Sequence, residues 1–89
     1  MKEFIIRIGK DTNPIKAAKS ICGQLLEGSD VKVDAIGMLA NYTAIKAFIQ
    51  VQKDLTMHKM LIAFIPSFLD LETDNGLKTT VRWEVKIIN

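Results

Sequence analysis

Alternating apolar residues in the first half of the chain predict two strands. The first covers residues 3–9, and the second runs from Val31 to Gly37. A period of two residues is the signature of a strand. The first segment holds few polar positions, so we expect it to be buried on both faces of a sheet.

Helical periodicity predicts one helix after each of these strands. The first helix covers Pro14 to Glu27; Thr12 or Asn13 can cap its start, and Gly28 suits its carboxyl-terminal cap. Its apolar stripe comprises Ile15, Ala18, Cys22, Leu25 and Leu26. The second helix runs from about residue 39 to residue 54. Its apolar stripe comprises Ala40, Ala44, Ala47, Phe48, Val51 and Leu55, and its solvent-facing positions are Thr43, Lys46, Gln50 and Lys53.

The last third of the chain predicts a β-hairpin. Residues 60–72 are strand-like, and Pro66 within them indicates a sheet edge or a bulge. Asn75-Gly76 is a strong signal for a two-residue turn. Residues 79–87 then alternate cleanly between apolar and polar side chains, which is typical of a half-buried strand.

The element order βαβαββ predicts an α/β fold of the two-layer α+β kind. Right-handed crossovers between the first parallel strands would place both helices on one face of a four-stranded mixed sheet. At 89 residues the chain has room for a single domain, residues 1–89. We expect Ile6, Leu25, Phe48 and Val85 to lie in its core.

The second helix has an apolar arc wider than one small sheet covers. Tyr42, Ile45 and Ile49 lie beside its main stripe. Because such a surface is commonly buried by a symmetric interface, we expect a homodimer that uses these residues and part of the hairpin.

Composition limits the remaining possibilities. No apolar run approaches the roughly 20 residues of a membrane span, and the amino terminus does not resemble a signal peptide. A single cysteine forms no internal disulfide, so the expected location is cytoplasmic. The net charge of +2 does not by itself indicate nucleic acid.

The sequence offers no constellation typical of an enzyme, a metal site or a cofactor site. His58 is the only histidine and has no identifiable catalytic partner, and Cys22 lies on an apolar stripe. The acids Asp70, Glu72 and Asp74 suit a solvated hairpin better than a cation site. We therefore expect a protein that is not an enzyme, without metal or cofactor.

One cluster of cations follows the first strand. Lys10 comes directly after it, and Lys16 and Lys19 occupy the first turns of the first helix. A helix amino terminus already favours anions through its free N–H groups, so this arrangement can hold a phosphate. Asp11 lies among the three lysines and opposes that effect.

Several short blocks resemble the stage V sporulation protein S family. They are Ala35-Ile36-Gly37, Ala44-Ile45-Lys46-Ala47, Ile65-Pro66-Ser67-Phe68-Leu69-Asp70 and Lys78-Thr79-Thr80-Val81. The beginning, Ile8-Gly9-Lys10 followed by a proline and a helix, is also similar to the archaeal chromatin protein Alba, which shares the βαβαββ order.

The resemblance implies a small cytoplasmic dimer in a superfamily that binds DNA and RNA, with a role in sporulation or developmental regulation. Of the three contact regions of Alba-like proteins, the loop before the first helix is matched by Lys10 and Lys16. The loop after the second strand lacks its basic residue, because Met38 and Leu39 follow Gly37. The hairpin, basic in Alba, here carries Asp70, Glu72 and Asp74 with only Lys78 and Arg82.

Two hypotheses about function follow. In the first, the protein is a non-enzymatic regulator that contacts the phosphate backbone of DNA or RNA without reading bases. The residues assigned to that contact are Lys10, Lys16, Lys19, Lys46 and Lys78. In the second, it is a protein-interaction module that works as a homo-oligomer and does not contact nucleic acid directly.

Overall fold

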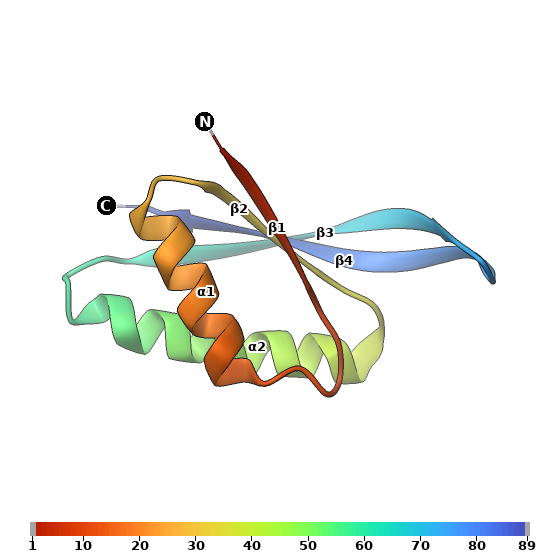
Figure 1. Cartoon of the computed structure of the whole chain (residues 1–89), viewed down its shortest axis with the longest axis horizontal. Helices are drawn as coiled ribbons and strands as arrows, with labels where there is room; N and C mark the ends of the chain where they lie inside the picture. Colours follow the sequence, from red (N-terminus) through yellow and green to blue (C-terminus); the bar gives the residue numbers. More distant parts are fainter. Residues whose placement is uncertain (1, 89) are drawn as a thin grey trace.

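The computed structural model describes residues 2–88, apart from the side chains of Leu71 and Thr73. The predicted βαβαββ order is confirmed (Figure 1). The elements are β1 (Glu3–Ile8), α1 (Pro14–Leu26), β2 (Asp30–Ala35), α2 (Gly37–Thr56), β3 (Ile62–Thr73) and β4 (Gly76–Ile87).

The four strands form one mixed sheet in the order β1-β2-β4-β3. β1 and β2 are parallel, and the β2–β4 and β3–β4 pairs are antiparallel. Both helices lie on the same face of this sheet, as predicted from right-handed crossovers (Figure 1). We call the opposite face the open face.

Local sequence explains where the helices begin and end. The Asn13 side chain accepts hydrogen bonds from the backbone N–H groups of Ile15 and Lys16, and Pro14 is the first helical residue. Gly28 follows α1 with a φ of +83°, a left-handed conformation that glycine adopts without steric cost. Of the two caps that the sequence allowed for α1, the structure uses Asn13.

The core lies between the sheet and the two helices. Leu25, Phe48 and Val85 are buried as predicted, and Ile6 is partly buried against them. The Phe48 ring stacks on Phe64 at 4.6 Å between centroids and meets Trp83 edge-on at 5.2 Å. Phe48 therefore fastens the middle of α2 to the β3–β4 hairpin.

Three expectations about burial and turns were wrong, and a fourth concerns Thr43. β1 is not buried on both faces: it is an edge strand, and Ile5 and Arg7 are exposed on the open face, which no helix covers. Ile15 and Leu26 are more than half exposed because they lie at the margins of the stripe that meets the sheet. The turn of the hairpin comprises residues 74–75, one position earlier than predicted, and Gly76 begins β4.

Thr43 was predicted to face solvent but is 4% exposed. Its hydroxyl lies 3.2 Å from the carbonyl oxygen of Lys10 and 3.1 Å from that of Leu39. A buried polar group is tolerated where it finds such partners, and this one joins α2 to the loop that follows β1.

The β3–β4 hairpin extends beyond the rest of the sheet. β2 pairs with β4 only from Val81 to Val85, whereas β3 pairs with β4 as far as Thr73 and Gly76. The far part, from the Phe68–Val81 pair to the turn, projects as a two-stranded arm (Figure 1). We call it the hairpin arm. Pro66 lies at its base in an edge strand, where a missing N–H is tolerated.

Candidate nucleic-acid interface

Lys10 stands in a tight turn between β1 and α1. The backbone N–H of Gly9 donates to the Thr12 hydroxyl at 2.9 Å, and the N–H of Thr12 donates back to the Gly9 carbonyl at 3.2 Å. Thr43 contacts the Lys10 carbonyl from α2. The backbone that carries Lys10 is therefore fixed from both sides.

The turn from β2 into α2 faces the Lys10 turn. Gly37 has a φ of +85°, which residues with a side chain rarely adopt. The Asn41 amide donates to the carbonyls of Ala35 and Gly37 at 3.2 and 2.8 Å and holds this turn in place. No side chain caps α2, and its first turn contains no acid. Its amino terminus thus keeps the partial positive charge that favours anions.

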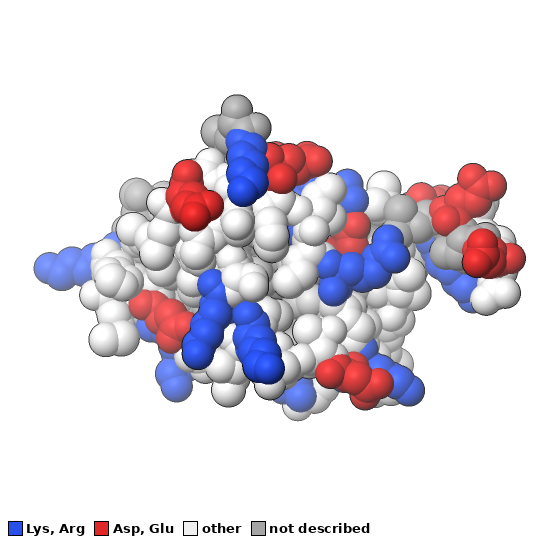
Figure 2. All heavy atoms as spheres, in the orientation of Figure 1, with Lys and Arg blue, Asp and Glu red and all other residues white. Residues whose placement is uncertain are grey.

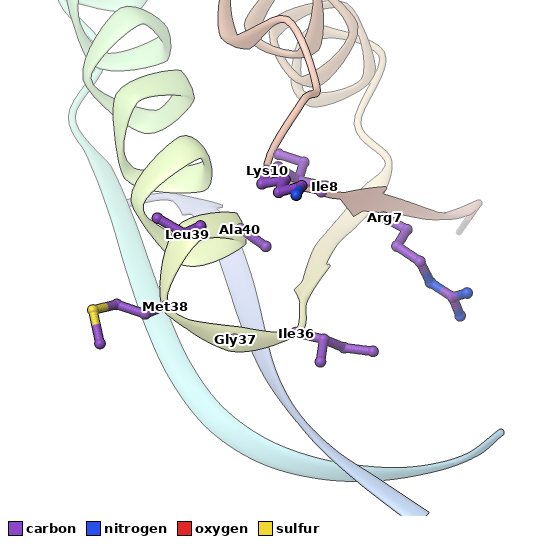
Figure 3. A pocket seen from close by; sticks show the side chains of 9 residues that line it. Arg7, Ile8, Lys10, Ile36, Gly37, Met38, Leu39 and Ala40 are labelled. Atoms are coloured by element: carbon purple, nitrogen blue, oxygen red, sulfur yellow. The ribbon is translucent and has the colours of Figure 1, made fainter. Parts of the chain in front are cut away.

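A hollow of about 430 Å³ lies between these two turns. It is lined by residues 7–10 and 36–40, from the carboxyl ends of the parallel strands β1 and β2 (Figure 3). Arg7 lines it as well as Lys10, and sequence analysis did not single out Arg7. In Figure 3 Arg7 and Ile36 project away from the helices, whereas Met38 points away from Lys10 on the other side of α2. We call this the Lys10 hollow.

The other predicted lysines lie on three elements around the molecule. Lys16 and Lys19 are exposed on α1, Lys46 is exposed on α2, and Lys78 is exposed on the hairpin arm. None of these four lines the Lys10 hollow. The Lys46 amine lies 4.8 Å from the centre of the Tyr42 ring, a cation–π contact within the predicted dimer surface.

Two cations of the open face, Lys32 and Arg82, form ion pairs with acids. Lys32 lies 2.8 Å from Glu3 and 3.5 Å from Asp30. Arg82 binds the buried carboxylate of Asp34 through two nitrogens, at 2.7 and 2.8 Å. This hydrogen bonding raises the pKa of the Arg82 guanidinium. Sequence analysis counted Arg82 among the few cations of the hairpin. In the structure its guanidinium is bound to Asp34 within the sheet.

The charges on the described surface are mixed in sign. Figure 2 shows basic and acidic side chains interleaved over the face in view, with acidic side chains gathered at the far end of the hairpin arm. Asp70, Glu72 and Asp74 are exposed there, and Asp70 accepts a hydrogen bond from the Thr79 hydroxyl. On the face in view, contact with phosphate would therefore depend on individual cations and not on one continuous basic patch.

The predicted dimer residues form an exposed apolar surface on α2. Tyr42 is 60% exposed, Ile45 42% and Ile49 58%. A shallow hollow of about 340 Å³ runs beside Ile45 and Ile49 toward Phe64 and Trp83. These side chains are exposed, as a dimer interface requires, and the homodimer itself stays a prediction.

The residues considered for chemistry are dispersed. Cys22 is half-buried, and burial, followed by the nearby Asp54 carboxylate, raises the pKa of its thiol. His58 is exposed after α2. Among the residues that the structure describes, no three His, Cys, Asp or Glu side chains lie together as metal ligands would. Neither described helix has both the length and the apolar character needed to cross a membrane.

Comparison with known proteins identifies the family. The family model for stage V sporulation protein S matches residues 4–88, nearly the whole chain. This chain belongs to the stage V sporulation protein S family. No match was found among curated protein sequences.

The fold is similar to that of a solved Alba protein. Alba from Thermoplasma volcanium superposes with a TM-score of 0.56 at 14% sequence identity, covering 97% of this chain and 100% of that chain. At such low identity the similarity concerns the fold alone. The Alba-like architecture expected from the sequence is therefore confirmed.

Proposed function

We propose that this member of the stage V sporulation protein S family is a non-enzymatic, homodimeric nucleic-acid-binding protein that acts in sporulation or developmental regulation. The observation that carries the proposal is the Lys10 hollow. There a cation on a fixed turn faces the uncapped amino terminus of α2, and both favour a phosphate group. The family match and the Alba-like fold support the same function.

The mode of contact that fits this site is backbone binding. Lys10 and Lys16 are close in sequence, and Lys19, Lys46 and Lys78 add exposed cations on α1, α2 and the hairpin arm. The sequences of the two helices that carry Lys16, Lys19 and Lys46 do not resemble a base-reading recognition helix. We therefore expect affinity without strong sequence preference, since phosphate contacts carry no base information.

Removing Lys10 and Lys16 together tests this assignment. The Lys10→Ala/Lys16→Ala variant should bind every sequence more weakly and show a flatter dependence on salt, because fewer counterions are released. Lys32→Ala is the matched control: Lys32 is already paired with Glu3 and Asp30, so its removal should leave binding unchanged. Fluorescence anisotropy with labelled duplex DNA and RNA measures both. Equal binding by the double variant and the wild type would contradict the assignment.

A second candidate function is a protein-interaction module without direct nucleic-acid contact. The exposed apolar residues Tyr42, Ile45 and Ile49 favour it, because such a surface is characteristic of protein interfaces. An anisotropy that does not change when the protein is added to labelled duplex DNA or RNA, even at low salt, would support this candidate over the first.

A further inference from the structure

A second hollow lies on the other side of the amino terminus of α2, at the base of the hairpin arm. Its volume is about 670 Å³. Its apolar lining consists of Met38, Pro66, Phe68, Val81 and Trp83. The polar residues Asn41, Ser67 and Thr79 and the backbone of Gly37 complete the lining. The hollow is therefore suited to a largely apolar group that also carries a few polar atoms. We call it the Trp83 hollow.

Hydrogen bonds and packing fix the orientation of Trp83. Its indole N–H donates to the Asn41 side-chain oxygen at 2.9 Å, and the Asn41 amide is itself bound to the carbonyls of Ala35 and Gly37. The edge-on contact with Phe48 holds the ring from the core side. The polar atom of the indole is thus satisfied inside the protein, and what the ring offers the hollow is aromatic surface.

Phe68 and Met38 leave large apolar surfaces in water beside this ring. Phe68 is 80% exposed and Met38 is 87% exposed. Phe68 pairs with Val81 and Pro66 pairs with Trp83, so Phe68 and Trp83 lie on the same face of the hairpin as diagonal neighbours. Methionine adapts its shape and packs well against aromatic rings. Two aromatic side chains and a flexible thioether therefore surround one hollow.

The Trp83 hollow adjoins the Lys10 hollow. Both are lined by Gly37 and Met38, the first residues of α2. A cationic site that favours phosphate thus lies beside an aromatic site that favours a planar ring. A nucleotide joins the same two kinds of group covalently, so the two adjoining hollows are complementary to it in charge and polarity.

We infer that the Trp83 hollow accepts one unstacked base of a single-stranded nucleic acid whose phosphate lies at the Lys10 hollow. The inference rests on the proposed function and adds to its phosphate contacts a base site that only a single strand can fill. Bases in a duplex are paired and stacked on one another, whereas a single strand can turn a base onto an aromatic platform. Such stacking tolerates any base, because every base has a π-face.

The acids of the hairpin arm favour the same placement of the strand, with its phosphate at the Lys10 hollow and its base in the Trp83 hollow. Asp70 is hydrogen-bonded to Thr79, which also lines the Trp83 hollow. A carboxylate there repels phosphate, so the backbone of a bound strand is directed to the Lys10 side. The same carboxylate can accept a hydrogen bond from an amino group of a base.

Trp83 reports on its own hollow, because it is the only tryptophan in the chain. A short single-stranded DNA of mixed sequence should quench its fluorescence as it binds. The same strand annealed to its complement, and an abasic strand of equal length, should bind without this quenching. Phe68→Ala should weaken binding to the single strand by roughly tenfold and leave binding to the abasic strand unchanged.

Leu77→Ala provides the matched control. Leu77 is another exposed apolar residue of the hairpin arm, 73% exposed, and does not line the Trp83 hollow. Its removal should change neither affinity nor quenching. Because Phe68 and Leu77 are both largely exposed, both variants should keep the unfolding midpoint of the wild type.

The outcomes separate this inference from the proposed function. Salt-dependent binding of single strands with unchanged Trp83 fluorescence, and equal affinity in Phe68→Ala, would overturn the base site and leave the proposed function intact. Absence of binding to any strand or duplex would overturn both. A second copy of the chain could fill the hollow instead. In that case Trp83 fluorescence would change with protein concentration in the absence of nucleic acid, and Phe68→Ala would have a lower mass in solution than the wild type. These two results together would overturn the inference.

Discussion

The ion pair between Asp34 and Arg82 is the most buried charge contact among the described residues. The Asp34 side chain is 5% exposed and that of Arg82 25% exposed, and the two meet through a pair of parallel hydrogen bonds across the β2–β4 ladder. A carboxylate removed from water in this way depends on its partner, because the loss of hydration must be compensated. The pair fixes the register of the two central strands on the open face.

Breaking this pair from one side should be costly. Arg82→Met should lower the free energy of unfolding by about 3–5 kcal/mol, because it leaves the Asp34 carboxylate buried without a counter-charge. Urea denaturation measures the change. Lys86→Met is the control: Lys86 meets Glu84 at 3.7 Å in a more exposed pair, and its loss should cost less than about 1 kcal/mol. Equal small losses in both variants would contradict this account.

At the scale of elements, periodicity predicted type and order but not position in the sheet. The strand signal of β4 and the glycine after α1 were predicted correctly, and the cap of α1 was narrowed to Thr12 or Asn13, because these signals are local. The apolar run of β1 did not reveal an edge strand, because strand order depends on contacts distant in the sequence. Thr43 was misassigned for the same reason: its burial depends on the Lys10 loop, 33 residues away.

The contact of α2 with the hairpin can be tested at Phe48. Phe48→Ala should lower the free energy of unfolding by about 3–5 kcal/mol, because it opens a cavity between the Phe64 and Trp83 rings. Ile15→Ala should change it by no more than about 1 kcal/mol, since Ile15 is 55% exposed although it follows the helical stripe. An unchanged unfolding midpoint for Phe48→Ala would show that this face of α2 does not pack as described.

At the scale of the whole molecule, sequence analysis located part of the candidate interface. Lys10 was identified because glycine, lysine and a helix start follow one strand directly. Arg7 and the Trp83 hollow were missed, because they depend on which strands lie side by side. Phe68 and Trp83 are 15 positions apart in the sequence and become neighbours only through the register of the hairpin.

The apolar surface of α2 predicts a homodimer. Sedimentation at tens of micromolar protein should give twice the mass of one chain, because a symmetric interface can bury Tyr42, Ile45 and Ile49. Ile45→Asp should shift the protein toward monomer by placing a charge in that interface. Ile5→Asp is the matched control: Ile5 is 46% exposed, close to the 42% of Ile45, but lies on the open face. A monomeric wild type would contradict the dimer.

The salt dependence of nucleic-acid binding by the wild-type protein tests the central claim most directly. If about four to six phosphates are neutralised per dimer, the logarithm of the association constant should fall with the logarithm of salt concentration at a slope of about −4 to −5. The measurement requires one labelled strand or duplex and a series of salt concentrations. A slope in that range is the predicted result, and an affinity that does not change with salt would contradict backbone binding.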